Sequence, residues 1–282
     1  MKFKVFSKIR FFFLIYSVMI FSACHDSDKI EPEYGERTVL IYMAADNNLS
    51  EDGETNIKSI LKGMEQTAGR LVIYIDPRYD VPRLLTVKGG KGCRLDTLET
   101  YTEENSASPE VLARVVQEVQ KRYPASSYGL VLWSHGLGWV PPEYSFPGGY
   151  AMRLPDPDMP RTKYYAEDEH PGTTGKAYMD IREMAARLPG HFNFILWDVC
   201  FMGGIEVAYE LRNKTDYMIA SPAEVISDGF PYEKIVPLFW GGEEAMKQIE
   251  EKGYAVPFAN DSRQLIKVGV NFSSKTRNID SW

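Results

Sequence analysis

Two apolar segments of the chain each end on a residue that can take part in nucleophilic chemistry. Residues 192–204, FNFILWDVCFMGG, lead into Cys200, and residues 128–138, YGLVLWSHGLG, lead into His135. Short apolar runs bounded by glycines fit strands buried on both faces of a parallel sheet, and ligands of such sheets bind at the carboxyl ends of the strands. We therefore expect the two side chains to meet at one edge of a sheet.

A cysteine facing a histidine is the pair that nucleophilic catalysis by sulfur requires. The thiolate is the nucleophile, and a nearby imidazolium lowers the thiol pKa by several units from about 8.5. We predict that Cys200 attacks a carbonyl carbon, that His135 protonates the leaving amine, and that the backbone N–H groups of Gly136 and Cys200 hold the oxyanion. The alternatives are a disulfide between Cys200 and Cys93 and, more weakly, a His/Cys metal site without further ligands at the usual spacings.

Two aspartates accompany the cysteine. Asp198 precedes it by two residues, and Asp228 lies in the loop 221–231, SPAEVISDGFP, after the next expected strand. Two carboxylates that converge beside a thiol would hold a cation such as an arginine side chain through charge-assisted hydrogen bonds. The alternative for each aspartate is a cap or turn role.

The composition indicates a folded domain. Of the 282 residues, 44% are hydrophobic and 25% are charged, which is enough apolar material for a substantial core. The formal net charge of −7 argues against nucleic acid as a partner.

The first 23 residues are typical of a lipoprotein signal peptide. Four basic residues precede the apolar run 11–21, which is too short to span a bilayer as a mature helix. The residues before Cys24 resemble a bacterial lipobox, so we expect lipidation of Cys24, a polar tether over residues 24–36, and anchoring in the bacterial cell envelope. The alternative is an ordinary signal peptide with an incidental cysteine.

The remaining pattern predicts an α/β/α sandwich with a mostly parallel central sheet. We expect one helix capped by Ser50 and another that starts at Ser108-Pro109. The predicted strands cover residues 37–45, 71–75, 81–88, 93–98, 130–133, 192–197 and 216–220, and a further helix covers 205–212.

The stretch 141–176 is rich in Pro, Gly and charge and lacks apolar periodicity. A loop of this length inside a compact domain is usually a lid, a binding loop or a processing segment. Its basic residues offer trypsin-like cleavage points, and the alternative is a plain surface insertion. These residues are Arg153, Arg161, Lys163 and Lys176.

Four segments carry a resemblance to a known family. TVLIYMAADNNL, LVLWSHGLGW, FILWDVCFMGGIEVAYEL and SPAEVISDGFPY resemble the clostripain family of cysteine peptidases, relatives of caspases, legumains and gingipains. The resemblance spans residues 37–239. It implies a caspase-like fold, cleavage after Arg or Lys, a His135/Cys200 dyad, and Asp198 and Asp228 in the specificity pocket. It also implies activation by autocleavage between His135 and Cys200, and calcium dependence in some members. We expect no required cofactor and a monomer.

We therefore divide the chain after the tether into a peptidase domain, 37–240, and a C-terminal segment, 241–282. Family members typically continue further, and residues 252–282 lack clear amphipathic periodicity. The C-terminal segment is therefore interpreted either as a truncated or frame-shifted end or as the chain's own end. The rival function is that of a catalytically inactive surface lipoprotein that binds a partner.

Overall fold

The computed structural model describes residues 35–138, 164–169 and 175–240, together with the short strands 271–272 and 279–281. The expected signal peptide, Cys24 and most of the tether lie outside these residues. None of the described helices is both long and apolar enough to cross a bilayer.

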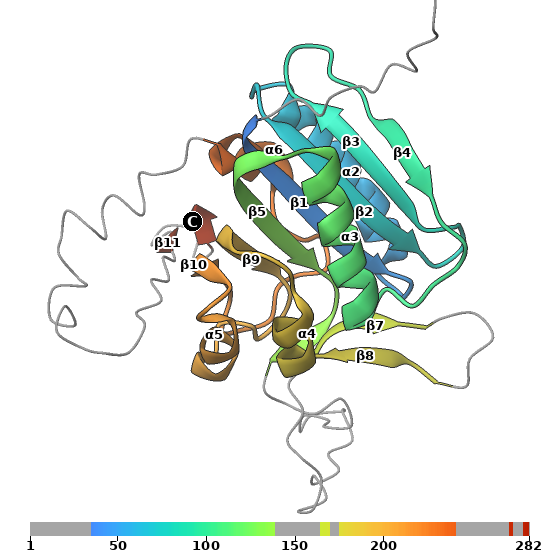
Figure 1. The fold of residues 1–282 in the computed structure, drawn as a ribbon, viewed down its shortest axis with the longest axis vertical. Helices are drawn as coiled ribbons and strands as arrows, with labels where there is room; N and C mark the ends of the chain where they lie inside the picture. Colours follow the sequence, from blue (N-terminus) through green and yellow to red (C-terminus); the bar gives the residue numbers. More distant parts are fainter. Residues whose placement is uncertain (1–34, 139–163, 170–174, 241–270, 273–278, 282) are drawn as a thin grey trace, which may run out of the picture. The chain divides into compact units, whose positions relative to one another are not determined.

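A seven-stranded sheet forms the centre of the domain (Figure 1). Its five parallel strands lie side by side in the order β10, β9, β5, β1, β2, and β3 and β4 extend it as an antiparallel hairpin. The strands are β1 (Gly35–Ala45), β2 (Arg70–Pro77), β3 (Arg83–Lys88), β4 (Asp96–Thr100), β5 (Ala125–Trp133), β9 (Phe192–Asp198) and β10 (Thr215–Ile219).

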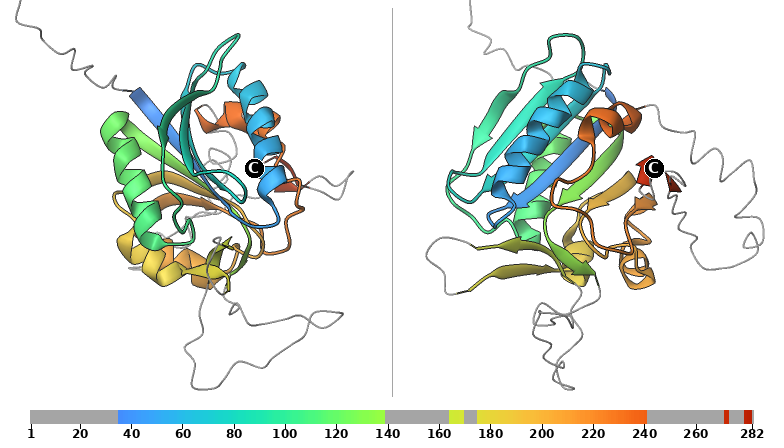
Figure 2. Two further views of the ribbon diagram at one scale, coloured as in Figure 1. Left: turned by 90° about the vertical axis from the view of Figure 1, so that its right-hand side faces the viewer. Right: turned by 180° about the vertical axis from the view of Figure 1, so that it is seen from behind.

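Helices cover both faces of this sheet. One face is covered by α3 (Pro109–Arg122), α4 (Ile181–Arg187) and α5 (Ile205–Leu211). The other is covered by α2 (Ser50–Met64), α6 (Tyr232–Ile235) and the 3-10 turn η1 (Val236–Phe239), and the two layers are seen from the side in Figure 2. The predicted three-layer sandwich is therefore confirmed.

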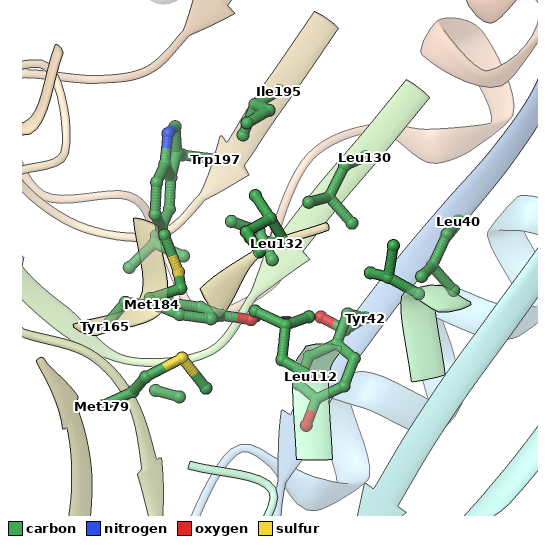
Figure 3. Close-up of a cluster of buried hydrophobic side chains, with 14 of the residues drawn as sticks. Leu40, Tyr42, Leu112, Leu130, Leu132, Tyr165, Met179, Met184, Ile195 and Trp197 are labelled. Atoms are coloured by element: carbon green, nitrogen blue, oxygen red, sulfur yellow. Dashed lines mark hydrogen bonds between the residues drawn. The ribbon is translucent and has the colours of Figure 1, made fainter. Parts of the chain in front are cut away.

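Successive side chains of β1 point to opposite faces of the sheet and so join the two hydrophobic cores in turn. Leu40 and Tyr42 join the core beneath α3 and α4, whereas Val39 and Ile41 join the core beneath α2. Figure 3 shows side chains of the first of these cores, among them Trp197. The Trp197 ring meets Tyr165 edge to face at 5.2 Å. Each large apolar side chain buried in this way contributes about 1.5 to 3 kcal/mol relative to exposure.

A second, three-stranded antiparallel sheet corrects one prediction. It comprises β6 (Gly136–Gly138), β7 (Tyr164–Asp168) and β8 (Ala177–Asp180). All five residues of β7 are buried, although the sequence predicts a loop throughout 141–176. The sequence did not predict β7 because the strand ends on two acids, Glu167 and Asp168, and consecutive carboxylates are rare in a buried strand. The remainder of that predicted loop, 139–163 and 170–174, lies outside the described residues.

The helix starts follow the predictions in one case of two. Ser108 caps α3, and its Oγ accepts the backbone N–H of Glu110 at 3.2 Å. Ser50 instead forms the first residue of α2, and its Oγ accepts the N–H of Arg78 at 3.0 Å. Helix α4, which the sequence analysis did not predict, is capped by Asp180. Two short strands, β11 (Asn271–Phe272) and β12 (Ile279–Ser281), pair within the C-terminal segment.

Candidate active site

The strand register places His135 and Cys200 on one edge of the sheet. Strands β5 and β9 are parallel neighbours, and Trp133 pairs with Asp198. His135 and Cys200 each follow their strand's last paired residue by two positions. They therefore leave adjacent strands at the same carboxyl end, as the sequence predicts.

The segments that carry these two residues are in direct contact. A methyl group on Gly136 would lie 2.5 Å from Cγ1 of Val199 and 2.4 Å from Cε of Met202. On Gly138 it would lie 2.3 Å from the carbonyl oxygen of Phe201. Distances this short leave room only for glycine at both positions. The backbone of β6 therefore packs directly on the turn 199–202, which holds Cys200.

Backbone strain gathers at the same place. Within the described residues, only Phe201 and Ala166 combine a side chain beyond glycine with positive φ, at 62° and 64°. Phe201 directly follows Cys200, and the N–H of Ala166 donates to the carbonyl oxygen of His135 at 3.0 Å. A left-handed residue costs roughly 1 to 2 kcal/mol and persists where surrounding contacts impose it, which is common at functional sites.

The Cys200 thiol is held by the loop 221–231. Its sulfur accepts the N–H of Val225 at 3.3 Å, and its S–H donates to the Val225 carbonyl oxygen at 3.5 Å. Burial raises the pKa of this thiol, and the charges of Glu224 and Asp198 add to that effect, while the Val225 hydrogen bond opposes it. At neutral pH Cys200 is therefore a thiol.

His135 is neutral as well. Burial lowers its pKa, Glu167 and Glu169 raise it, and Lys176 lowers it. In the described part of the chain no hydrogen bond joins His135 to Cys200. In this conformation burial disfavours the charge on each group, which favours a neutral pair. The imidazolium that lowers the thiol pKa stays a prediction.

One partner of His135 was missed by the sequence analysis. Nε2 of His135 lies 2.8 Å from Oδ1 of Asn48, a residue in the turn after β1. The only signal in the sequence is the polar run Asp46-Asn47-Asn48 directly after a buried strand.

Asp198 is buried and holds the loop that follows β10. Its Oδ2 accepts the backbone N–H of Phe230 at 3.1 Å and the hydroxyl of Tyr232 at 2.8 Å. Burial raises the pKa of Asp198 to about 6, against the lowering effect of these two hydrogen bonds. Asp198 therefore has a structural role in holding this loop, which is the alternative that the sequence left open. Among the described residues, no group hydrogen-bonds to its Oδ1.

Asp228 is exposed in the loop 221–231. The next residue, Gly229, lies close to the carboxyl group of Asp198. A methyl group on Gly229, which has a φ of 71°, would lie 2.9 Å from Oδ2 of Asp198. The fold thus brings the two predicted aspartates into one neighbourhood, with one buried and the other in solvent.

Neither non-catalytic alternative for Cys200 is supported by the described residues. Cys93 and Cys200 are both free, so no disulfide joins them. Over the described ranges, no group of three or more His, Cys, Asp or Glu residues is arranged to hold a metal ion.

Buried carboxyl groups gather at the end of β2. Asp76 is buried there, and burial, followed by the charges of Glu103, Asp168 and Asp46, raises its pKa to about 9. Calcium dependence stays a prediction of the family resemblance.

The three-layer fold and the Cys/His pair on one rim define the class of cysteine peptidases built on a parallel sheet. Comparison with known proteins narrows the class: residues 41–256 match the sequence model of the clostripain family. The chain belongs to this family.

Several relatives support that assignment. Clostripain from Hathewaya histolytica is 26% identical over 228 residues, which cover 70% of this chain and 41% of clostripain. A secreted C11 cysteine protease from Bacteroides thetaiotaomicron, solved with an irreversible peptide inhibitor, is 34% identical with a TM-score of 0.63. An inactive zymogen C11 protease from Parabacteroides distasonis is 36% identical with a TM-score of 0.61.

The matches to the two solved structures cover about four fifths of this chain but less than two thirds of those proteins. They cover 79% and 82% of this chain, and 59% and 61% of the two solved chains, respectively. Residues 233–282 also match a model of the PD-(D/E)XK nuclease superfamily. Most of those residues lie outside the described part, so this match assigns no site.

Proposed function

We propose that this chain is a cysteine endopeptidase that cleaves after Arg or Lys and uses His135 and Cys200. The observation that carries the proposal is the departure of these two residues from adjacent parallel strands at one rim, in segments that pack directly on each other. Membership of the clostripain family supports the same reaction.

The mechanism starts from two neutral groups. His135 accepts the proton of the Cys200 thiol as the sulfur attacks the scissile carbonyl carbon, and the resulting imidazolium protonates the leaving amine. Water then hydrolyses the thioester and releases the acid. The N–H groups of Gly136 and Cys200 stabilise the oxyanion of both steps, a contribution of about 2.7 to 4 kcal/mol per donor. The thiol must first leave its contact with Val225.

The proposed specificity rests on Asp198 and Asp228. Oδ1 of Asp198 is the oxygen not used to hold Phe230 and Tyr232, so it can accept from the guanidinium or ammonium group of a substrate. Asp228 adds a second, exposed negative charge beside it. Because the pKa of Asp198 is about 6, the pocket binds cations best above that pH.

The proposed activation is a cut between His135 and Cys200. Of the four basic residues predicted as cleavage points in 141–176, Lys176 is the one that the structure describes, and its ammonium group is ion-paired with both Glu167 and Glu169. Cleavage after Lys176 would require breaking both pairs, so we propose Arg153, Arg161 or Lys163 as the processing residue. The solved relative described as an inactive zymogen supports activation in this family member.

Further proposals concern the anchor and assembly. We propose that Cys24 is lipidated, that the chain is displayed on the bacterial envelope, and that it works as a monomer without a required cofactor. Loss of detergent partitioning in Cys24→Ser, and sedimentation of the purified chain, test the first and third of these.

The decisive test uses the two free cysteines as a matched pair. Cys200→Ala should abolish hydrolysis of arginyl peptides and labelling by an arginine-based, cysteine-reactive probe. Cys93→Ala should keep both within about twofold, because Cys93 lies in a turn of the distant β3–β4 hairpin region. Residual hydrolysis of more than a few per cent in Cys200→Ala would exclude the assignment.

The rival role, an inactive binding lipoprotein, has one observation in its favour. The thiol contacts Val225 and is not hydrogen-bonded to His135. If the purified chain neither cuts itself, as judged by its mass, nor reacts with the probe before or after limited trypsin treatment, the binding role replaces the peptidase role.

A further inference from the structure

We propose that Asn48 is the third member of the site, a positioning residue whose Oδ1 accepts the Nε2–H of His135 and directs Nδ1 toward Cys200. This proposal rests on the proposed peptidase function. The observation behind it is the 2.8 Å separation between Oδ1 of Asn48 and Nε2 of His135.

The order of the strands places the imidazole between its two partners. In the sheet, β5 lies between β9 and β1. Cys200 follows β9, His135 follows β5 and Asn48 follows β1, all at the carboxyl ends of parallel strands. The two ring nitrogens of histidine face opposite sides of the ring. A hydrogen bond to Nε2 from the β1 side therefore turns Nδ1 toward the β9 side.

The chemistry of the amide fixes the proton. A carbonyl oxygen only accepts hydrogen bonds, so the ring nitrogen facing it must carry the hydrogen. The other nitrogen is then bare, and a bare nitrogen is what a general base needs to take the thiol proton. Asn48 thereby selects the tautomer that can act on Cys200.

The neighbouring asparagine shows that the turn is built to present Asn48. Asn47 is fully buried, and its Nδ2 donates to the carbonyl oxygens of Ala44 at 3.0 Å and Glu167 at 2.8 Å. Its Oδ1 accepts the N–H of Leu49 at 2.9 Å. Asn47 thus ties the turn to β1 and β7, and the side chain of Asn48 projects outward to the histidine.

The charges around His135 make a neutral partner useful. Glu167 and Glu169 lie near the ring, but both are paired with Lys176, and Glu169 is also paired with Arg78 at 2.6 Å. Their attraction for an imidazolium is therefore largely offset. An amide adds no charge, so the ring stays neutral and basic at the pH of catalysis, whereas a carboxylate in its place would hold the ring protonated.

The test compares two substitutions at one position. Asn48→Ala removes the acceptor, and kcat for an arginyl peptide should fall about 10- to 100-fold with KM within about threefold, because a misplaced base slows only the chemical step. Asn48→Asp keeps the acceptor and adds a charge. It should restore part of kcat, while the pH midpoint assigned to His135 rises by about one unit or more.

A control and a readout independent of activity complete the test. Asn193→Ala removes a half-buried asparagine at the opposite end of β9 and should change neither kcat nor the pH profile. The ¹⁵N chemical shifts of histidine-labelled protein should show a protonated Nε2 in the wild-type chain and a mixture of tautomers in Asn48→Ala.

The outcomes separate the two proposals. A kcat within twofold of wild type in Asn48→Ala, or unchanged ring ¹⁵N shifts, would overturn the role of Asn48 even in an active peptidase. If the wild-type chain shows no peptidase activity, the shifts alone decide whether Asn48 orients the ring. Because Asn48 is exposed, both variants are expected to fold, and thermal unfolding within a few degrees of wild type checks this.

Discussion

The histidine side and the cysteine side of this site are held in different ways. His135 is fixed by the exposed Asn48 side chain from the neighbouring strand end and by a backbone bond to the buried strand β7. Cys200 is fixed by the backbone of Val225, in a loop whose residues are mostly exposed. The base is therefore preorganised, and the nucleophile is held by a segment that can move with less disruption of the core.

On the proposed function, the cysteine side is the one that keeps the chain at rest. A half-buried neutral thiol bonded to a loop is a resting nucleophile. The proposed activating cut between His135 and Cys200 would then also have to release the sulfur from Val225.

The largest effect on activity should come from a substitution that pushes the His135 segment and the Cys200 segment apart. Gly138→Ala would place a methyl group 2.3 Å from the carbonyl oxygen of Phe201 and strain a backbone with a φ of 57°. We expect the turn after Cys200 to shift, with a loss of activity of about 100-fold or more and a loss of stability of about 1 to 3 kcal/mol. Peptide hydrolysis and urea unfolding measure the two.

Gly92→Ala is the matched control for this change. Gly92 also has positive φ, 74°, but no atom lies within 4 Å of an added methyl group. It should lose about 1 kcal/mol from backbone strain alone and keep full activity. Equal activity losses in the two variants would show that global destabilisation, and not the contact between the two sides, controls the site.

Much of this arrangement could be predicted from the sequence, because the parallel strands are continuous apolar runs. Strands β5 and β9 carry such runs directly into His135 and Cys200, and parallel pairing alone then fixes a common edge. The prediction of one rim needed no knowledge of side-chain positions.

What the sequence could not supply depends on contacts between distant residues. Asn48 and His135 are 87 positions apart, and only the placement of β1 next to β5 brings them together. Likewise, the hydrogen bonds that tie Asp198 to Phe230 and Tyr232 follow from how the loop 221–231 folds back. The neutral state of the pair follows from depth of burial, which residue types do not reveal.

A second, smaller effect on activity should come from removing the carboxylate charges of Asp198 and Asp228. Asp198→Asn should lower kcat/KM for arginyl peptides by about tenfold for each 1.4 kcal/mol of lost attraction. It should also remove the part of the acidic limb of the pH profile near pH 6 that Asp198 causes, and leave the part that His135 causes. Asp228→Asn removes the exposed charge and should keep that limb. An unchanged preference for Arg over a neutral residue in both variants would remove these aspartates from the pocket.

The thiol itself gives a third test of the contrast. In Cys93→Ala, alkylation of Cys200 by iodoacetamide should be several-fold slower at pH 7.5 than that of an unstructured cysteine, because burial raises the thiol pKa. The rate should increase as the pH rises above about 8.5 and should rise at neutral pH once the chain has been cleaved. Full reactivity before cleavage would show that the loop does not restrain the nucleophile.

The smallest effect should come from Tyr232→Phe, which removes one hydrogen bond to Asp198 and keeps the ring. That bond favours the ionised carboxylate, so its loss should raise the pKa of Asp198 above its present value of about 6. A shift of about one unit would lower the ionised fraction at pH 7 by roughly twofold, and kcat/KM for arginyl peptides by the same factor. The stability cost, about 1.5 to 3 kcal/mol for a bond to a charged group, should appear at pH 8 and shrink at pH 5, where the carboxyl is protonated in both variants. Urea unfolding at the two pH values checks the sign. An equal stability cost at pH 5 and pH 8 would mean that Asp198 does not titrate between these pH values. The acidic limb of the pH profile of peptide hydrolysis would then belong to another group at this edge of the sheet.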